Sequence, residues 1–326
     1  MNELRVFDRI SDAAGWTPLV RLGPTVADLG CEVFAKIEFL NPMGSVKDRI
    51  ARFLIEKAIA DGRLSAGGQI VESSSGNTAM GLAMMAVLEH LRCTMVVRRQ
   101  TSKEKLDCLR AMGVDLVLVD GDLPPHDPES YNRKAQEIAA RNPDAFFPDQ
   151  HNNRDNNEAH YRSTGPEIWQ QMEGRIDHLV AGIGTGGTIC GVARYLKEQD
   201  PTIEVVAIDP EGSVFFDHFH SGRHEPCEPY LIEGLGDEEI IGCPDFELID
   251  DMYRVSDREA FHATRELARR EAILAGGSSG AALWGVRKLA AGLDRPARIV
   301  TLFPDSGDRY LSTIFNDEWM KEKGLL

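Results

Sequence analysis

One lysine, Lys47, stands where an amine could be used for chemistry. It lies in residues 41–49 (NPMGSVKDR), after an apolar strand-like run and before a segment with the apolar spacing of an amphipathic helix. Pro42 and Gly44 predict a turn, and Ser45 can cap the following helix, so Lys47 falls in the first helical turn. The helix macrodipole disfavours a cation at that end. An ordinary solvated lysine is the alternative for this residue taken alone, so the other motifs must decide.

A glycine-rich stretch, residues 182–188 (GIGTGGT), could bind phosphate through backbone N–H groups at a helix N-terminus. Three of its glycines also match the GxGxxG pattern of nicotinamide dinucleotide enzymes, and Asp209 would then bind the ribose. The hydroxyls of Thr185 and Thr188 favour a single phosphate group instead. The position of the stretch, past the middle of the chain, favours the same interpretation.

The elements that must position these residues alternate between strand and helix. Strands are predicted at residues 33–40, 69–72, 94–97, 114–119, 178–182, 204–208 and 298–303. Helices are predicted from Lys47 to about 62 and at 78–91, 102–112, 130–141, 156–172, 189–198, 258–271 and 281–292, whereas 211–230 looks irregular. Strands joined by helical crossovers indicate parallel βαβ units. The sequence therefore predicts two doubly wound α/β lobes, with ligands at the carboxyl ends of the strands.

Composition excludes several classes of protein. The 326 residues are 42% hydrophobic and 27% charged, which is typical of a globular chain with two domains or one large one. A net charge of −16 argues against nucleic-acid or membrane partners. The six cysteines form no CxxC pair, and we expect them to be reduced in a cytoplasmic protein. His218, His220 and His224 are too loosely spaced to predict a metal site.

Five short motifs follow one another along nearly the whole chain: SVKDR at 45–49, ESSSGNT at 72–78, GTGGT at 184–188, GGSSG at 276–280 and PDSGDRY at 304–310. This set resembles the fold-type II pyridoxal phosphate enzymes, and within these it is similar to the cysteine synthase and cystathionine β-synthase family. The resemblance implies pyridoxal 5'-phosphate as cofactor. It also implies two three-layer α/β/α lobes with mostly parallel sheets, as in the tryptophan synthase β-like fold, and the cofactor in the cleft.

The resemblance further implies a domain division. Residues 41–150 would form a smaller mobile domain with the loop for the substrate carboxylate. Residues 1–40 and 151–326 would form a larger domain with the loop for the cofactor phosphate. No haem module and no C-terminal regulatory domain are expected, so the chain would be a catalytic core, and a homodimer is expected from the family.

Individual roles follow from the same resemblance. Lys47 would hold the cofactor as a Schiff base and, once displaced, remove the α proton. Asn77 would bond the cofactor's phenolic oxygen, and Ser278 would face its pyridine nitrogen. The other predicted cofactor-binding residues are Gly184, Thr185, Gly186, Gly187, Thr188 and Asp305. The predicted substrate-binding residues are Ser74, Ser75, Gly76, Asn77, Thr78, Gln150 and Gly234.

The implied reaction is β-replacement on L-serine, O-acetylserine or O-phosphoserine through an aminoacrylate intermediate. A neutral Ser278 would make the cofactor ring a weaker electron sink, which favours loss of a β leaving group. A thiol nucleophile would give L-cysteine from sulfide or L-cystathionine from homocysteine.

Two alternatives stay open. After residues 233–236 (EGLG) the chain reads Asp237-Glu238-Glu239, where relatives differ. Such acids usually form a solvated face, but facing the cleft they would suit an amine nucleophile, as in a 2,3-diaminopropionate-type synthase. The alternative from another class is an NAD-dependent oxidoreductase that uses residues 182–187.

Overall fold

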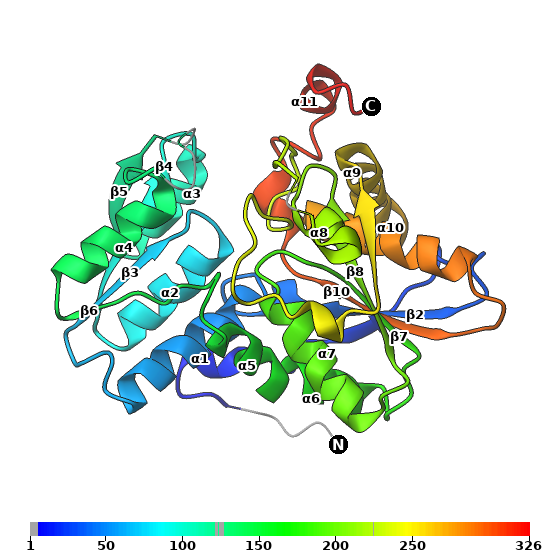
Figure 1. The fold of residues 1–326 in the computed structure, drawn as a ribbon, viewed down its shortest axis with the longest axis horizontal. Helices are drawn as coiled ribbons and strands as arrows, with labels where there is room; N and C mark the ends of the chain where they lie inside the picture. The colour runs from blue at the N-terminus through cyan, green and yellow to red at the C-terminus, as the bar shows by residue number, and fades with distance from the viewer. Residues whose placement is uncertain (1–5, 121–122, 124–126, 224) are drawn as a thin grey trace. The chain divides into compact units, whose positions relative to one another are not determined.

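The computed structural model describes residues 6–120, 123, 127–223 and 225–326. The chain divides into two compact units, Met1–Gly15 with Asn41–Asp155 and Trp16–Leu40 with Asn156–Leu326. Each unit contains one sheet that is wholly or mostly parallel and has helices packed on both faces (Figure 1). That residues 41–150 form a smaller mobile domain stays a prediction.

The sheet of the first unit has the strand order β5-β4-β3-β6, and every pair is parallel. Its strands are β3 (Gln69–Ser73), β4 (Arg92–Arg98), β5 (Asp115–Val119) and β6 (Ala145–Phe146). Ile70 packs with α1 (Lys47–Ala60), α2 (Asn77–Leu88) and α3 (Lys103–Ala111), whereas its neighbour Val71 packs with α4 (Tyr131–Arg141). Successive strand residues point to opposite faces, which accounts for the two helical layers.

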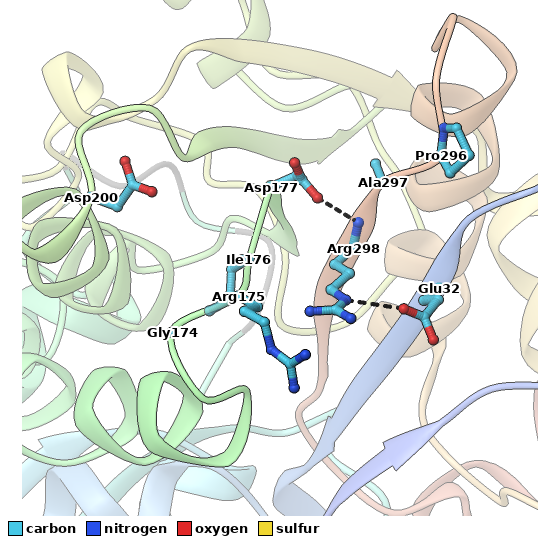
Figure 2. A pocket seen from close by; sticks show the side chains of 9 residues that line it. All are labelled: Glu32, Gly174, Arg175, Ile176, Asp177, Asp200, Pro296, Ala297 and Arg298. Atoms are coloured by element: carbon cyan, nitrogen blue, oxygen red, sulfur yellow. Dashed lines mark hydrogen bonds and ion pairs between the residues drawn. The ribbon is translucent and has the colours of Figure 1, made fainter.

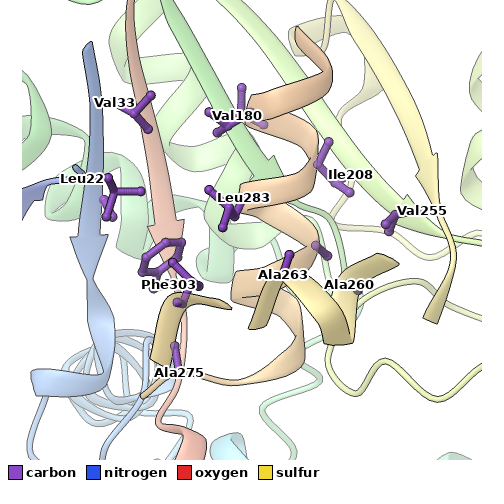
Figure 3. Packing of buried hydrophobic residues seen from close by; sticks show 14 of the residues in the cluster. Leu22, Val33, Val180, Ile208, Val255, Ala260, Ala263, Ala275, Leu283 and Phe303 are labelled. Carbon is purple, nitrogen blue, oxygen red and sulfur yellow. The ribbon is translucent and has the colours of Figure 1, made fainter. Parts of the chain in front are cut away.

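The sheet of the second unit has the order β1-β2-β10-β7-β8-β9, and only β1 runs antiparallel to its neighbour. Its strands are β1 (Leu19–Arg21), β2 (Glu32–Ile37), β7 (His178–Gly182), β8 (Glu204–Pro210), β9 (Asp251–Val255) and β10 (Arg298–Phe303). Val180 and Ile208 pack against Leu283 and the helices α9 (Asp257–Glu266) and α10 (Gly277–Ala291), as Figure 3 shows. Leu179 instead packs with α6 (Thr164–Gln171) and α7 (Gly187–Gln199).

Most predicted elements are confirmed, and strands 178–182 and 298–303 have the predicted bounds. The helix predicted at 156–172 is wrong in its continuity, because it is divided into α5 (Asp155–Arg162) and α6. Pro166 lacks the N–H that a continuous helix needs, so it fits only the first turn of a new helix. Ser163 lies at the break and donates its hydroxyl to Ala159 O at 2.7 Å.

Short elements were missed. Residues 211–230 were expected to be irregular, but α8 (Phe215–Ser221) lies within them. Strands β1, β6 and β9 and the helix α11 (Asp317–Glu322) were also not predicted. Within the part of the chain that the structure describes, no helix has the length and apolarity needed to cross a membrane.

Candidate functional site

Lys47 is the first residue of α1 and is half-buried. Its backbone N–H donates to Ser45 Oγ at 3.2 Å, although Val46 occupies the N-cap position. The next residue, Asp48, is fully buried, and its Oδ2 accepts from Met43 N at 2.6 Å. A carboxylate is favourable at a helix N-terminus, and this one ties the preceding turn to the helix. The backbone around Lys47 is therefore held on both sides.

Gly81 lets α2 approach the start of α1. A Cβ atom at Gly81 would lie 2.9 Å from Ala51 Cβ and 3.1 Å from the carbonyl oxygen of Lys47, both closer than side chains normally pack. The methyl group of Ala79, two residues earlier, is fully buried in the core of this unit. The close contact therefore depends on Gly81 and joins the lysine's helix to the helix that follows the serine-rich loop.

The predicted carboxylate loop connects β3 to α2. Ser74 is buried, and its Oγ accepts from the backbone N–H groups of Gly76 at 3.4 Å and Ala79 at 3.3 Å. Thr78 Oγ1 donates to Gln150 Oε1 at 2.5 Å, although the two residues are 72 positions apart in sequence. The structure thus brings Thr78 and Gln150 together, and the N-terminal N–H groups of α2 begin at Asn77, where an anion can be bound.

Glu72 is the residue of β3 that precedes Ser73 at the start of this loop. It belongs to the motif at residues 72–78, but no role was predicted for it from the sequence. Its Oε1 accepts from Ser73 N at 2.8 Å, and its Oε2 accepts from Gln150 N at 3.3 Å. Burial raises the pKa of the Glu72 carboxyl to about 7, because the charged form is poorly solvated there.

The predicted phosphate loop connects β7 to α7 in the second unit. Gly186, at the N-cap position, has φ of +78°, a conformation that favours glycine. A Cβ atom at Gly184 would lie 2.3 Å from the carbonyl oxygen of Gly234, and one at Gly187 would lie 1.9 Å from Asn156 Oδ1. Glycine is therefore required for packing within this unit as well as for exposing N–H groups at the helix N-terminus.

Two side chains from α5 support the threonines of this loop, and sequence reasoning missed both. Asn156 Nδ2 donates to Thr185 Oγ1 at 3.1 Å. His160 Nε2 lies 3.1 Å from Thr188 Oγ1, while its Nδ1 lies 2.8 Å from Thr164 Oγ1. Asn156 and His160 are both fully buried. Glycine N–H groups, a helix N-terminus and two held hydroxyls form a cradle whose donors fit the phosphate of pyridoxal phosphate.

Ser278 and Asp305 lie near each other in the fold of the second unit. Ser278 is the second residue of α10 and is buried. Just before it, Gly276 N donates to the carbonyl oxygen of Asp305 at 3.0 Å. The buried carboxylate of Asp305 accepts the hydroxyl of Tyr310 at 2.8 Å. The backbone bond therefore positions the start of α10 relative to the end of β10.

The acidic residues after Gly234 have separate environments. Gly236 N donates to Ile183 O at 2.8 Å, which ties this loop to the phosphate loop. Asp237 Oδ1 accepts from the backbone of Glu238 at 2.7 Å and of Glu239 at 3.2 Å, so its carboxylate closes the turn. The side chains of Glu238 and Glu239 are exposed. This arrangement agrees with the interpretation of a solvated face.

Asp209 does not have the environment of a ribose-binding acid. It is fully buried at the end of β8, and its Oδ2 accepts from Phe216 N at 3.0 Å at the start of α8. Burial raises the pKa of this carboxyl to about 7. Asp209 therefore does not support the interpretation of residues 182–187 as a dinucleotide-binding motif.

A polar depression lies at the amino ends of β2, β7 and β10, in the sheet of the second unit (Figure 2). There Arg298 donates to Asp177 Oδ2 at 2.8 Å through its backbone and to Glu32 Oε2 at 3.0 Å through Nε. The residues that line it include none of the predicted site residues.

No group of three or more His, Cys, Asp or Glu side chains that could hold a metal ion occurs among residues 6–120, 123, 127–223 and 225–326. The ring of His218 packs against Phe246, with 5.2 Å between centroids, and His220 Nε2 lies 3.0 Å from Met252 O. His224 lies outside the described residues.

Comparison with known proteins identifies the family of the chain. The family model described as "Pyridoxal-phosphate dependent enzyme" matches residues 10–305. The chain is 40% identical over 324 residues to cystathionine beta-synthase of Apis mellifera, covering 99% of this chain and 64% of that protein. It is 39% identical over 307 residues to a cysteine synthase of Staphylococcus aureus, covering 94% and 96%. It is 40% identical over 312 residues to an N-(2-amino-2-carboxyethyl)-L-glutamate synthase of Ralstonia nicotianae, covering 95% and 90%.

The chain spans 56% to 64% of the length of the cystathionine beta-synthases it matches. The matched region contains both sheets, and their α/β arrangement is the fold-type II architecture that the sequence predicted. This family uses pyridoxal phosphate, so the dinucleotide alternative is set aside. The chain belongs to the pyridoxal-phosphate dependent enzyme family.

Proposed function

We propose that this enzyme catalyses β-replacement on L-serine or an activated serine, with a thiol as the nucleophile. The observation that carries the proposal is the contact at Gly81, which joins the helix of Lys47 to the helix that follows the carboxylate loop. An amine for the cofactor and a cradle for an amino acid are thereby built into one unit. The names of the relatives, cystathionine beta-synthase and cysteine synthase, support the same reaction class.

Pyridoxal phosphate, when bound, supplies an aldehyde that captures amines and a ring that withdraws electrons from the α carbon. Lys47 Nζ would hold the cofactor and would also take the proton from the α carbon of the substrate. The cofactor phosphate would be bound through backbone N–H groups and hydroxyls of the phosphate loop, which are those of Gly184, Thr185, Gly186, Gly187 and Thr188.

The carboxylate loop orients the substrate. Ser74, Ser75, Gly76, Asn77, Thr78 and Gln150 are our proposed contacts for the amino-acid carboxylate, with Gly234 at the second substrate. The N–H groups at the start of α2 suit an anion. Asn77 is also our proposed donor to the cofactor's phenolic oxygen.

Ser278 would face the ring nitrogen with a neutral hydroxyl. Such a partner supplies no negative charge to hold that nitrogen protonated, which favours elimination of a β substituent. Asp305 is also one of our proposed cofactor-binding residues; its backbone carbonyl accepts from Gly276 N, and its Oδ2 accepts from Tyr310.

An amine nucleophile is the second candidate. The relative from Ralstonia nicotianae, an N-(2-amino-2-carboxyethyl)-L-glutamate synthase, favours it. The exposed Glu238 and Glu239 do not, because their side chains are solvated. Turnover of serine, O-acetylserine and O-phosphoserine with sulfide, homocysteine and glutamate, each pair measured by product mass, decides between them. We expect a thiol product; an exclusive amine product would contradict the proposal.

Lys47→Ala tests the central assignment. Borohydride treatment should attach the cofactor covalently to the peptide that contains Lys47 in the unmodified protein, and mass spectrometry of the digest detects this. In Lys47→Ala the label should disappear and turnover should fall by at least about a thousandfold, because one amine serves both roles. Lys103→Ala is the control, since this lysine is exposed on α3 in the same unit. Labelling of another lysine, or an active Lys47→Ala variant, would refute the assignment.

Two sequence predictions remain proposals beside this function. We propose that residues 41–150 move as one domain, and that the chain forms a homodimer. Sedimentation equilibrium should then give twice the chain mass of 36.1 kDa. A single-chain mass at micromolar concentration would exclude the dimer.

A further inference from the structure

A buried carboxyl group, Glu72, joins two segments that supply the proposed contacts to the substrate carboxylate. It is the fourth residue of β3 and is 1% exposed. One oxygen accepts from Ser73 N at 2.8 Å, at the start of the loop. The other accepts from Gln150 N at 3.3 Å, beyond β6. The backbone N–H groups of Ser73 and Gln150, at the two ends of the proposed cradle, therefore bind the two carboxylate oxygens of Glu72.

A second connection closes the arrangement. Gln150 Oε1 accepts the hydroxyl of Thr78 at 2.5 Å, on the first turn of α2. The backbone of Gln150 is thus bound to Glu72 while its side chain is bound to Thr78. Asp149, the preceding residue, has φ of +50°, which costs conformational energy and is maintained by contacts such as these. A shift of Glu72 would move Gln150 relative to α2.

A side chain of α4 also contacts the residue that follows Glu72. Asn132 Oδ1, on α4, accepts the hydroxyl of Ser73 at 2.6 Å. Titratable groups lie around this cluster on three segments of the chain. Asp149 lies on the segment after β6, the phenol of Tyr131 on α4, and Arg98 of β4 lies 5.2 Å from the ring centroid of Tyr131.

We propose that Glu72 is a positioning residue for the substrate: it holds the loop after β3 and Gln150 in the arrangement that binds an amino-acid carboxylate. This inference rests on the proposed function. Glu72 does not itself touch the reacting atoms; it acts through Gln150 and the loop.

The burial of Glu72 also implies a pH dependence of substrate binding. Burial, with a smaller contribution from Asp149, raises the pKa of Glu72 to about 7. A substrate carboxylate bound nearby would repel the ionised form in the same way, so binding favours protonated Glu72. By linkage, affinity for a carboxylate-bearing substrate falls as the pH rises through this range.

Glu72→Gln is the direct test. The glutamine amide offers only one acceptor oxygen, so its NH₂ group must face one of the two N–H donors, Ser73 N or Gln150 N. We expect the dissociation constant for L-serine, followed through the absorption of the bound cofactor, to rise about tenfold. Binding of 2-aminoethanol, which has the amine and hydroxyl but no carboxylate, should stay unchanged. The KM for serine should rise with kcat within about twofold.

Glu104→Gln is the matched control, because Glu104 is exposed on α3 in the same unit. It should leave both affinities unchanged. The unmodified protein provides a second measurement should the variant not fold. There, the ratio of the serine to the 2-aminoethanol dissociation constant should rise between about pH 6 and 8, since amine titration cancels in the ratio.

Three results would overturn the inference. One is an unchanged serine affinity in Glu72→Gln, and another is an equal loss of affinity for serine and 2-aminoethanol. The third is a ratio in the unmodified protein that does not depend on pH. If serine fails to perturb the bound cofactor in the unmodified protein at all, the proposed function itself fails, and this inference with it.

Discussion

Asn156 determines how one hydroxyl of the phosphate loop can be used. Because Asn156 Nδ2 donates to Thr185 Oγ1, the hydroxyl's own proton is directed to another acceptor. A phosphate oxygen is an acceptor of that kind, and hydrogen bonds to charged acceptors are the stronger ones. The buried amide therefore prepares Thr185 to act as a donor toward an anion.

Asn156→Ala should weaken cofactor binding. The change removes the donor to Thr185 and opens space beside Gly187, whose Cα lies against the Asn156 side chain. We expect the dissociation constant of pyridoxal phosphate, measured by absorption titration of the apoprotein, to rise about tenfold. Gln199→Ala, at the exposed end of α7, is the control and should bind as the unmodified protein does. Unaltered affinity in Asn156→Ala would show that Thr185 needs no such support.

The residues of the motifs can be recognised as candidates in the sequence, whereas the buried residues that contact them cannot. Lys47, Ser278 and the glycines stand in short patterns of unusual composition. Asn156, His160 and Glu72 act through contacts with residues distant in sequence, and nothing in their immediate neighbours indicates those contacts. A buried amide or imidazole looks the same in sequence as a solvated one.

At the scale of elements, the packing of α1 on α2 controls where Lys47 lies. Gly81→Ala places a methyl group 2.9 Å from Ala51 Cβ and 3.1 Å from the Lys47 carbonyl oxygen, and backbone must move to accept it. We expect the free energy of unfolding to fall by about 1–3 kcal/mol, as for other overpacked cores. We also expect kcat to fall more than in proportion to the fraction unfolded, because the lysine moves.

Urea unfolding and steady-state kinetics measure the two effects of Gly81→Ala. Gly292→Ala is the control, since Gly292 is exposed at the end of α10 and its nearest heavy atom would lie 3.5 Å from the new Cβ. This variant should change stability by less than about 0.5 kcal/mol. If Gly81→Ala behaves like the control, the helices do not depend on that contact.

Elements were predicted well where an apolar run is long and bounded by turn residues. Strands β7 and β10 have those features, and their bounds are confirmed. The break between α5 and α6 was missed because apolar spacing continues across it, although Gly165-Pro166 marks it. Short elements such as α8 and β9 contain too few residues for a period to be recognised.

At the scale of the whole molecule, the net charge requires the phosphate loop to attract its ligand through short-range interactions. A chain with a net charge of −16 repels a phosphate at long range. Residues 184–188 contain no lysine or arginine, so attraction there must come from N–H dipoles and hydroxyls at short range.

Relatives of similar length bear the names of both thiol-derived and amine-derived products. Overall architecture therefore predicts the reaction class, whereas the nucleophile depends on local contacts.

The stability of the whole molecule should decrease from mildly acidic to neutral pH. Burial raises the pKa of Asp209 from 3.8 to about 7 and that of Glu72 from 4.5 to about 7. The folded state therefore keeps protons that the unfolded state has released, and stability falls as the pH rises through this window. Each group contributes a slope of up to about 1.4 kcal/mol per pH unit. Asp209→Asn should flatten the curve by up to one such slope between about pH 5 and 7. Urea unfolding at several pH values measures it, and Asp120→Asn, at an exposed aspartate, should run parallel to the unmodified protein. If the Asp209→Asn curve is also parallel, the buried carboxyl does not titrate in this range.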